Sequence, residues 1–460
     1  MQMDARSGLS HPFRKQLGDG LVLRWSTPED TEGLAHLVGM AFRHKADQPL
    51  NKSLAEFVRS LMTGRCPFTT PYDYGLVEDT SRKGHPIVAC ASLWRHDWEY
   101  EGIRFPIGRP EMVASDPQYR HQGLIRELFA MLHAQSESEG RIVQGVTGIP
   151  YFYRQFGYEY ALDLGGSQTV KLAHIPPLKA GEQERCTLRR ATVEDIPFIQ
   201  KCYTQRQGES IVWNALPDAF WRFNIEEWEI EPAPGRPRNV HNDVQIIVDP
   251  QGCSLGYVFT AARRWEELFR VWAMDLVAGV NARELMPSLL RALKTLGEQA
   301  IVEDSENEPM QSIKLYLGGT HPLYDAFSKQ LAPVSEKPYA WYVRVSDLPA
   351  FMRLIAPALE RRLADSILAG YRGEVKLNFF RDGLRLVFQD GKLTQAEPWR
   401  APIYEPNESA SFAPLVFLQL LFGRRSLEEL EHVFPETRVS PDTEIVLHTL
   451  FPTRPSFVYG

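Results

Sequence analysis

The chain repeats a short pattern at a nearly constant spacing, and this repeat constrains its fold more than any other feature. Residues 23–30 (LRWSTPED) are matched by residues 188–195 (LRRATVED), at an offset of 189 − 24 = 165. Both segments predict a strand end, a threonine N-cap and an acidic first turn of a helix. A second match joins Tyr153 and Tyr324, at an offset of 324 − 153 = 171. Each match alone could be coincidence, but together they favour a tandem duplication.

The repeat predicts two domains of similar size, residues 20–170 and residues 185–337. A flexible lead-in at residues 1–19 would precede them, and residues 171–184 would form a linker, because they contain two prolines, a glycine and several charges. A chain of 460 residues is also too long for one compact core, which rarely exceeds roughly 250–300 residues.

Residues 338–460 have a different pattern and predict a third domain of α+β type. Apolar residues recur at helical spacing from Leu348 to Leu368. Residues 373–379 and 384–388 alternate around a tight turn and predict a hairpin. Ser426 begins a capping-box pattern that predicts a further helix.

Charge and composition disfavour several classes of protein. The net charge of −7 argues against general nucleic-acid binding. No apolar run of ~18 residues predicts a membrane-spanning helix, and the N-terminus does not look like a secretory signal. Five scattered cysteines without a C-x-x-C pair indicate a reducing, cytoplasmic location, and no histidine motif predicts a metal site.

The segment with the most specific chemistry combines a strand, a basic loop and a helix. Residues 108–115 predict a strand whose pairing stops at Pro117, which cannot donate to a ladder. The following helix would bury one apolar face and end near Gly140. That face consists of Leu124, Leu128, Met131 and Leu132.

Such a loop before a helix suits an anionic phosphate group. The free N–H groups of the first helical turn point at the anion, and the helix dipole adds favourable potential. Gly123 would let the backbone approach closely, while Arg120 and Arg126 add positive charge. By itself the pattern is weak evidence, since most loops of this kind are solvated turns.

The surrounding residues make the loop more specific. Residues 113–126 (VASDPQYRHQGLIR) resemble motif A of the GNAT superfamily of N-acetyltransferases, with its Q/R-x-x-G-x-G/A loop. Arg120 and Gly123 keep that pattern, but Ile125 stands where a second glycine or alanine is usual. This departure is typical of the branch of the mycobacterial enhanced intracellular survival (Eis) protein. Residues 148–159 (GIPYFYRQFGYE) are similar to a motif of the same branch.

The resemblance implies an architecture and an activity. The fold would be two tandem GNAT-type α/β domains followed by a sterol-carrier-protein-like α+β domain, assembled as a homo-oligomer, possibly a hexamer. The activity would be transfer of an acetyl group from acetyl-CoA to a primary amine, such as an aminoglycoside, a polyamine or a lysine side chain. The second domain keeps Gly279 but has no basic loop after it, so we expect it to have lost the cofactor.

The resemblance also assigns residues to acetyl-CoA. The pantetheine arm would contact the strand-edge backbone groups of Val113, Ala114 and Ser115. The pyrophosphate would be held by the loop and the first helical turn. These residues are Arg120, His121, Gln122, Gly123, Leu124, Ile125 and Arg126.

The reaction requires a base for the amine, whose pKa is ~10.4, and a proton donor for the departing thiolate. The resemblance implies Tyr153 as that donor, although its aromatic neighbours fit simple core packing equally well. It also implies that the terminal carboxylate, here that of Gly460, acts as the base. The branch usually ends in an aromatic residue, so a C-terminus that only packs on its own domain is an equal alternative.

An alternative function for the whole chain is a non-catalytic lipid-binding or regulatory protein that uses the third domain. Apolar side chains at strand spacing would then line a cavity, but such residues more often form a filled core. The candidates are Phe379, Leu386, Phe388, Leu415, Phe417 and Leu421.

Overall fold

A computed structural model of the protein describes residues 13–43, 45, 47–231, 240–303, 309–402 and 408–459. The chain divides into two compact units. The first consists of Met1–His96, Gly108–Gln144 and Ile230–Asn239, and the second of Asp97–Ile107, Gly145–Glu229 and Val240–Gly460. In the described ranges, no helix has the length and apolar character needed to cross a membrane.

The first unit is a sheet covered by helices on both faces. Its strands follow the order β1-β2-β3-β4-β5, and β1 to β4 pair antiparallel. They are β1 Arg14–Gly18, β2 Leu21–Trp25, β3 Tyr74–Asp79, β4 Ile87–Tyr100 and β5 Ile103–Ser115, with the short β6 Val143–Val146 after the last helix. The last residues of β4 and the first of β5 belong to the second unit.

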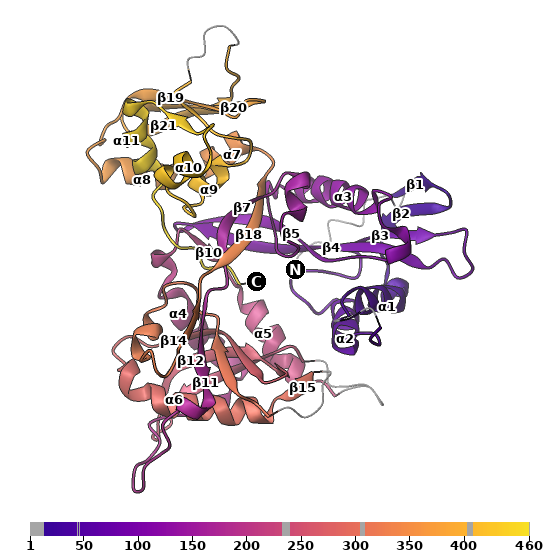
Figure 1. Cartoon of the computed structure of the whole chain (residues 1–460), viewed down its shortest axis with the longest axis vertical. Helices are drawn as coiled ribbons and strands as arrows, with labels where there is room; N and C mark the ends of the chain where they lie inside the picture. The colour runs from indigo at the N-terminus through magenta and orange to yellow at the C-terminus, as the bar shows by residue number, and fades with distance from the viewer. Residues whose placement is uncertain are drawn as a thin grey trace. The chain divides into compact units, whose positions relative to one another are not determined.

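The side chains of the sheet alternate between two cores. Helices α1 (Thr31–Ala41) and α2 (Lys52–Leu61) pack on one face, and α3 (Leu124–Ser138) packs on the other (Figure 1). The predicted apolar face of α3 is confirmed, because all four of its residues lie in one buried cluster with residues of β2, β3 and β4. Gly140 has φ +75° just beyond the end of α3, which fits its predicted place.

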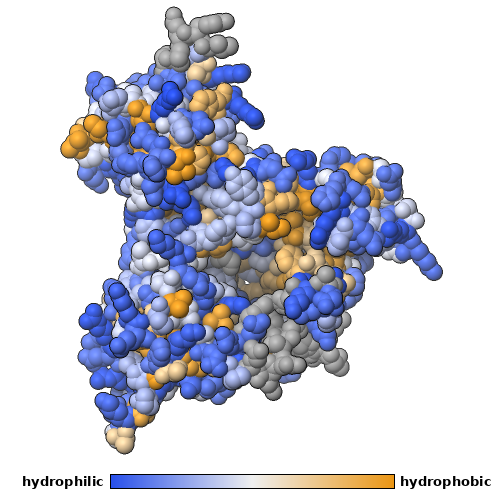
Figure 2. Space-filling model, viewed as in Figure 1, coloured by the Kyte–Doolittle hydropathy of each residue, from blue (hydrophilic) through white to orange (hydrophobic). Residues whose placement is uncertain are grey.

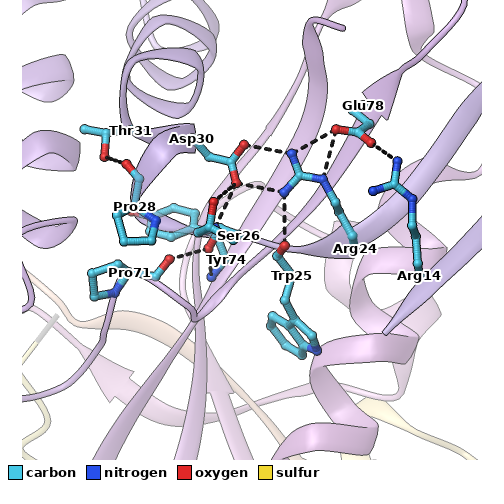
Figure 3. A network of polar contacts seen from close by, with 11 residues as sticks. Arg14, Arg24, Trp25, Ser26, Pro28, Asp30, Thr31, Pro71, Tyr74 and Glu78 are labelled. Carbon is cyan, nitrogen blue, oxygen red and sulfur yellow. Dashed lines mark hydrogen bonds and ion pairs between the residues drawn. The ribbon is translucent and has the colours of Figure 1, made fainter. Parts of the chain in front are cut away.

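The repeated sequence pattern folds into the same local structure twice. In the first unit Arg24 donates to both carboxylate oxygens of Asp30 at 2.7 and 2.8 Å and to Glu78 at 2.9 Å (Figure 3). In the second unit Arg189 donates to both oxygens of Asp195 at 2.7 Å. Each aspartate also closes a capping box with a threonine, at the start of η1 (Pro28–Asp30) and η5 (Val193–Asp195).

The second unit contains a sheet in the order β17-β8-β16-β14-β12-β11-β9. A buried core lies between this sheet and the eighteen-residue helix α6 (Ala282–Gln299). Helices α4 (Ile196–Thr204) and α5 (Asp218–Glu226) precede β11 in the chain. The strands are β8 Ser167–Lys171, β9 Thr187–Arg190, β11 Asn242–Val248, β12 Ser254–Ala261, β14 Leu268–Leu276, β16 Ser312–Leu315 and β17 Val334–Glu336, with β13 Arg263–Trp265 and β15 Ile301–Glu303 beside them.

Strand pairing in the second unit does not follow the order of the repeats along the chain. Strand β7 (Glu159–Leu164) pairs antiparallel with β18 (Tyr339–Val345), which comes after the second repeat. Strand β8, which directly follows β7, pairs with β16 and β17 instead. The two repeats therefore exchange strands at their ends.

The C-terminal part has its own sheet, in the order β21-β20-β19-β22-β23. The predicted hairpin is confirmed as β19 (Gly373–Asn378) and β20 (Gly383–Gln389), and the predicted capping box is present at Ser426. The remaining elements are β21 Lys392–Pro398, β22 Ala410–Ser411, β23 Arg438–Val439, α9 Phe417–Leu421, α10 Leu427–Val433 and α11 Pro441–Leu450.

The helical character predicted from Leu348 to Leu368 is confirmed as far as Ala364. The chain forms two helices there, α7 (Leu348–Leu354) and α8 (Ala356–Ala364), separated at Ile355 with φ −86° and ψ 3°. Pro357 explains the break, because it lacks the N–H that a continuous helix would need there. Sequence periodicity continues across the break because both helices bury apolar faces.

Five of the six apolar residues proposed to line a lipid cavity are buried, namely Phe379, Leu386, Phe388, Phe417 and Leu421. The sixth, Leu415, is partly exposed. The ring of Phe417 lies 5.6 Å from that of Phe379 and 5.4 Å from that of Phe451. The face of this part seen in Figure 2 is largely hydrophilic, with a few small apolar patches. These contacts favour a filled core.

The C-terminal end of α3 is fixed by an ion pair with β4. Arg95 donates to both oxygens of Glu139 at 2.7 Å, and Gln135 donates to one of them. Burial alone would raise the pKa of Glu139, but these hydrogen bonds and the charge of Arg95 lower it from 4.5 to about 2. Because the folded-state pKa is depressed, the pair stabilises the fold above about pH 4.5, and the stabilisation is lost as the pH falls toward 2.

Glu139→Gln is therefore expected to lower the free energy of unfolding at pH 7 by about 2 kcal/mol, after allowance for solvent screening of a half-buried pair. The difference from the wild type should shrink as the pH falls from 4.5 toward 3. Urea unfolding at several pH values measures it, and Glu127→Gln is the control, since Glu127 pairs with Lys15 at a solvent-exposed position. A difference that does not change with pH would contradict the expectation.

Candidate functional site

The loop between β5 and α3 presents unused backbone N–H groups at a helix N-terminus. The side chain of Asp116 accepts from the N–H of Gln118 at 2.8 Å and starts η2 (Pro117–Tyr119). Two residues with positive φ follow, His121 at +65° and Gly123 at +78°, and Gly123 caps α3. Within the ranges that the structure describes, the N–H groups of residues 121–125 donate to no protein acceptor.

The side chains of the loop divide into two groups. Arg120, His121, Gln122 and Arg126 are exposed, as is Gly123. The side chains of Leu124 and Ile125 instead pack in the core beneath α3, so only their backbone can contact an anion. A Cβ atom at Gly123 would meet nothing within 4 Å, so crowding does not require a glycine at this position. Glycine instead allows the positive φ and leaves the backbone N–H groups of the loop open to a ligand.

Strand β5 is irregular just before the residues predicted to contact a pantetheine arm. Met112 has φ +51°, a left-handed conformation that is rare for a side chain of its size. The hydroxyl of Ser92 donates to the carbonyl of Glu111 at 3.1 Å, and the thiol of Cys90 donates to that of Met112 at 3.5 Å. Two carbonyls of β5 thus accept from side chains next to a residue that departs from regular strand geometry. No glycine or asparagine at position 112 indicates this irregularity in the sequence.

The three residues that follow Met112 in β5 are only partly accessible. Val113 and Ser115 are partly exposed, whereas Ala114 is buried against α1 and α2. Burial raises the pKa of the neighbouring Cys90 thiol to about 12, so Cys90 stays a neutral hydrogen-bond donor.

Tyr153 lies in an aromatic cluster of the second unit. It belongs to η3 (Phe152–Phe156), and its side chain is 4% exposed. Its ring centroid lies 5.3 Å from that of Tyr342 and 6.3 Å from that of Tyr158. A Cβ atom at Gly148 would be 3.3 Å from the Tyr153 hydroxyl oxygen, so this hydroxyl lies against the backbone of Gly148. The burial fits core packing and also fits a phenol shielded from bulk water.

The C-terminal tail is docked as an extended strand. The N–H of Phe457 donates to Val212 at 2.9 Å, and its carbonyl accepts from the N–H of Asn214 at 3.0 Å, both on β10 (Val212–Asn214). The ring of Tyr459 contacts those of Phe220, Phe259 and Trp272 at 6.0, 5.4 and 6.3 Å. Gly460 lies outside the described residues, so its role as the base remains a prediction.

The predicted site residues are distributed over the two compact units. Residues 113–126 lie in the first unit, whereas Tyr153 and the tail lie in the second. In the second repeat, β14 leads through Gly279 (φ +91°) into α6, the same order of elements as β5, Gly123 and α3. Among the described residues, no group of three or more histidine, cysteine, aspartate or glutamate side chains is arranged to hold a metal ion.

Residues 23–161 match the sequence profile of the acetyltransferase (GNAT) domain. The chain contains a GNAT acetyltransferase domain. The match covers the whole loop at residues 113–126 and extends past Tyr153. The predicted resemblance to the GNAT superfamily is confirmed for residues 23–161, and this domain supports an acyltransferase.

Solved structures share the fold over almost the whole chain. A probable N-acyltransferase of Enterococcus faecalis is 15% identical with a TM-score of 0.64, and 96% of this chain and 100% of that one are covered. A GCN5-related N-acetyltransferase of Kribbella flavida is 18% identical, with a TM-score of 0.59 and coverage of 95% and 98%. Eis1 of Mycobacterium abscessus is 14% identical, with a TM-score of 0.56 and coverage of 95% and 99%.

At these identities the likeness shows a common α/β GNAT-type fold with mixed sheets. The sterol-carrier-like nature of residues 338–460 stays a prediction. A comparison with curated proteins finds no match.

Proposed function

We propose that the protein transfers an acetyl group from acetyl-CoA to a primary amine. The observation that best supports this proposal is the set of five consecutive N–H groups, residues 121–125, without a protein acceptor at the N-terminus of a fifteen-residue helix. A pyrophosphate fits these groups because its oxygens accept hydrogen bonds and its charge is stabilised by the helix dipole. The exposed side chains of Arg120 and Arg126 add positive potential.

The irregular part of β5 would receive the pantetheine arm. Its amides and carbonyls, at Val113, Ala114 and Ser115, are the backbone groups that an extended ligand could pair with in the manner of an added strand. Bound acetyl-CoA supplies a thioester. The amine nitrogen attacks its carbonyl carbon, so a C–N bond forms, the C–S bond breaks, and the amine loses a proton.

Tyr153 would protonate the departing sulfur. A phenol with a pKa near ~10 keeps its proton at neutral pH and can donate it as negative charge develops on the thiolate. The carboxylate of Gly460 would take the proton of the amine, by analogy with the branch that the chain resembles. The ring of Tyr459, the residue before Gly460, is docked among aromatic side chains, which is compatible with that role.

The second repeat would support the fold without binding a cofactor of its own. Residues 277–281, which follow β14, include Gly279 but have no lysine or arginine in the place of Arg120, although Arg283 stands in the first turn of α6. We therefore propose one acetyl-CoA site per chain. From the resemblance we also propose a homo-oligomeric assembly, with a hexamer as the form to test. The proposed reaction takes place in the cytoplasm, on an aminoglycoside, a polyamine or a lysine side chain.

The proposed activity is tested by offering the purified protein a panel of amines with acetyl-CoA and with propionyl-CoA. We expect CoA thiol to appear faster than in the absence of amine for at least one member of the panel, as followed with a thiol reagent. Calorimetry should show acetyl-CoA binding with a stoichiometry of one per chain. No release with any amine, together with no binding of acetyl-CoA, would contradict the proposal.

A further inference from the structure

Three tyrosine hydroxyls from two strands meet beside Tyr153. Tyr160 comes from β7, and Tyr339 and Tyr342 come from β18. The hydroxyl oxygens of Tyr160 and Tyr342 are 2.5 Å apart, and the hydroxyl of Tyr339 donates to that of Tyr160 at 2.9 Å. Burial alone would raise the pKa of Tyr160, but the hydrogen bonds that its oxygen accepts from Tyr339 and from the N–H of Tyr151, with the charge of Arg154, lower it.

Two of these hydroxyls hold the backbone just before Tyr153. The hydroxyl of Tyr342 donates to the carbonyl of Ile149 at 3.0 Å. The hydroxyl of Tyr160 accepts from the N–H of Tyr151 at 2.7 Å. The two bonds lie on either side of Pro150, so they fix the segment 148–151 from both ends.

The number of protons sets the direction of these bonds. A phenol has one proton to donate, and Tyr342 gives its proton to Ile149. Tyr160 must then donate to Tyr342 across the 2.5 Å contact, while it accepts from Tyr151. Hydroxyls that donate and accept in sequence polarise one another, which strengthens each bond in a shielded site.

The held segment needs such support because its conformation is unfavourable. Tyr151 has φ +67°, which costs a residue with a side chain roughly 1–2 kcal/mol relative to ordinary conformations. Its side chain is 70% exposed, so buried packing does not offset that cost. The ring of Tyr151 contacts Arg154 at 5.0 Å, but this contact leaves the backbone of the segment unsupported.

The segment in turn lies against Tyr153. Gly148 faces the Tyr153 hydroxyl, because a Cβ atom added to Gly148 would lie 3.3 Å from the Tyr153 hydroxyl oxygen. The ring of Tyr342 packs on that of Tyr153 at 5.3 Å and on that of Tyr160 at 4.2 Å. A shift of the segment or of Tyr342 would therefore move the Tyr153 hydroxyl.

We infer that Tyr160 and Tyr342 are positioning residues, which orient the Tyr153 hydroxyl for the transfer reaction through the segment 148–151. The inference rests on the proposed function, in which Tyr153 is the proton donor.

Tyr342→Phe and Tyr160→Phe test the inference, since each removes one hydroxyl and keeps the ring. We expect each to lower kcat about 10-fold while KM and Kd for acetyl-CoA stay within about twofold of the wild type. The kcat of the double variant should be little lower than the kcat of the less active single variant, because both hydroxyls hold the same segment. Tyr339→Phe is the control, because Tyr339 belongs to the same cluster but bonds to no residue of the segment 148–151.

Hydrogen exchange of the peptide that spans residues 148–152 gives a second measurement that does not require turnover. Exchange should accelerate several-fold in Tyr342→Phe and Tyr160→Phe but not in Tyr339→Phe. Unchanged hydrogen exchange in both Tyr342→Phe and Tyr160→Phe overturns the inference. So does a kcat equal to that of the wild type in both variants, if Tyr153→Phe lowers kcat. A wild type that releases no CoA with any amine would instead remove the proposed function on which the inference rests.

Discussion

Gly123→Glu is expected to weaken the binding of acetyl-CoA by roughly 30- to 1000-fold. The new carboxylate would stand among the N–H groups of residues 121–125, where the pyrophosphate is proposed to bind. At ~4 Å, repulsion between a carboxylate and a doubly charged pyrophosphate amounts to about 2 kcal/mol at the dielectric constant of water and about 4 kcal/mol at an effective dielectric constant of ~40, which suits an exposed loop. Calorimetric titration with acetyl-CoA measures the loss directly.

Gly140→Glu is a matched control for this variant. Gly140 lies beyond the other end of α3, its φ of +75° is close to the +78° of Gly123, and a Cβ atom at either glycine would meet nothing within 4 Å. Both variants therefore carry similar backbone strain and add the same charge. Only Gly123→Glu should lose acetyl-CoA binding. Tight binding by Gly123→Glu, or an equal loss in both variants, would contradict the proposed cradle.

The conformation of the loop between β5 and α3 could be predicted because its determinants are local. Pro117 ends the strand, the spacing of Leu124, Leu128 and Leu132 marks one helical face, and Gly123 supplies the left-handed residue before α3. The two capped helix starts were equally predictable, since a threonine and an aspartate three residues later suffice to close a capping box. Elements of this kind follow from a few neighbouring residues.

The positive φ of Met112 and the pairing of β7 with β18 could not be predicted in the same way. Methionine is not favoured at positive φ, so the residue type at position 112 does not indicate this conformation. The contact between Tyr160 and Tyr342 joins residues 182 positions apart. The alternating pattern of each strand shows which side chains share a face but does not specify the partner strand. Only the folded chain brings these hydroxyls to the segment before Tyr153.

Tyr153→Phe is expected to lower kcat about 100-fold and to leave the Kd for acetyl-CoA unchanged. General acid catalysis contributes about 10²–10⁴-fold to a rate, and a phenol that assists a thiolate of pKa ~8.5 belongs at the lower end of that range. The cofactor cradle at residues 121–125 does not include Tyr153, so the ground-state binding of acetyl-CoA has no reason to change. Steady-state kinetics with the best amine, together with calorimetry, separates these two effects.

The same variant decides between catalysis and packing for Tyr153. Phenylalanine keeps the ring that packs on Tyr342 and Tyr158, so a residue that only fills the core would give a nearly unchanged kcat. Tyr158→Phe is the matched control, because Tyr158 is fully buried in the same aromatic cluster and has no proposed part in the reaction. We expect similar melting temperatures for the two variants and a large fall in kcat for Tyr153→Phe alone. Equal kcat values in both variants would show that the hydroxyl of Tyr153 is not the proton donor.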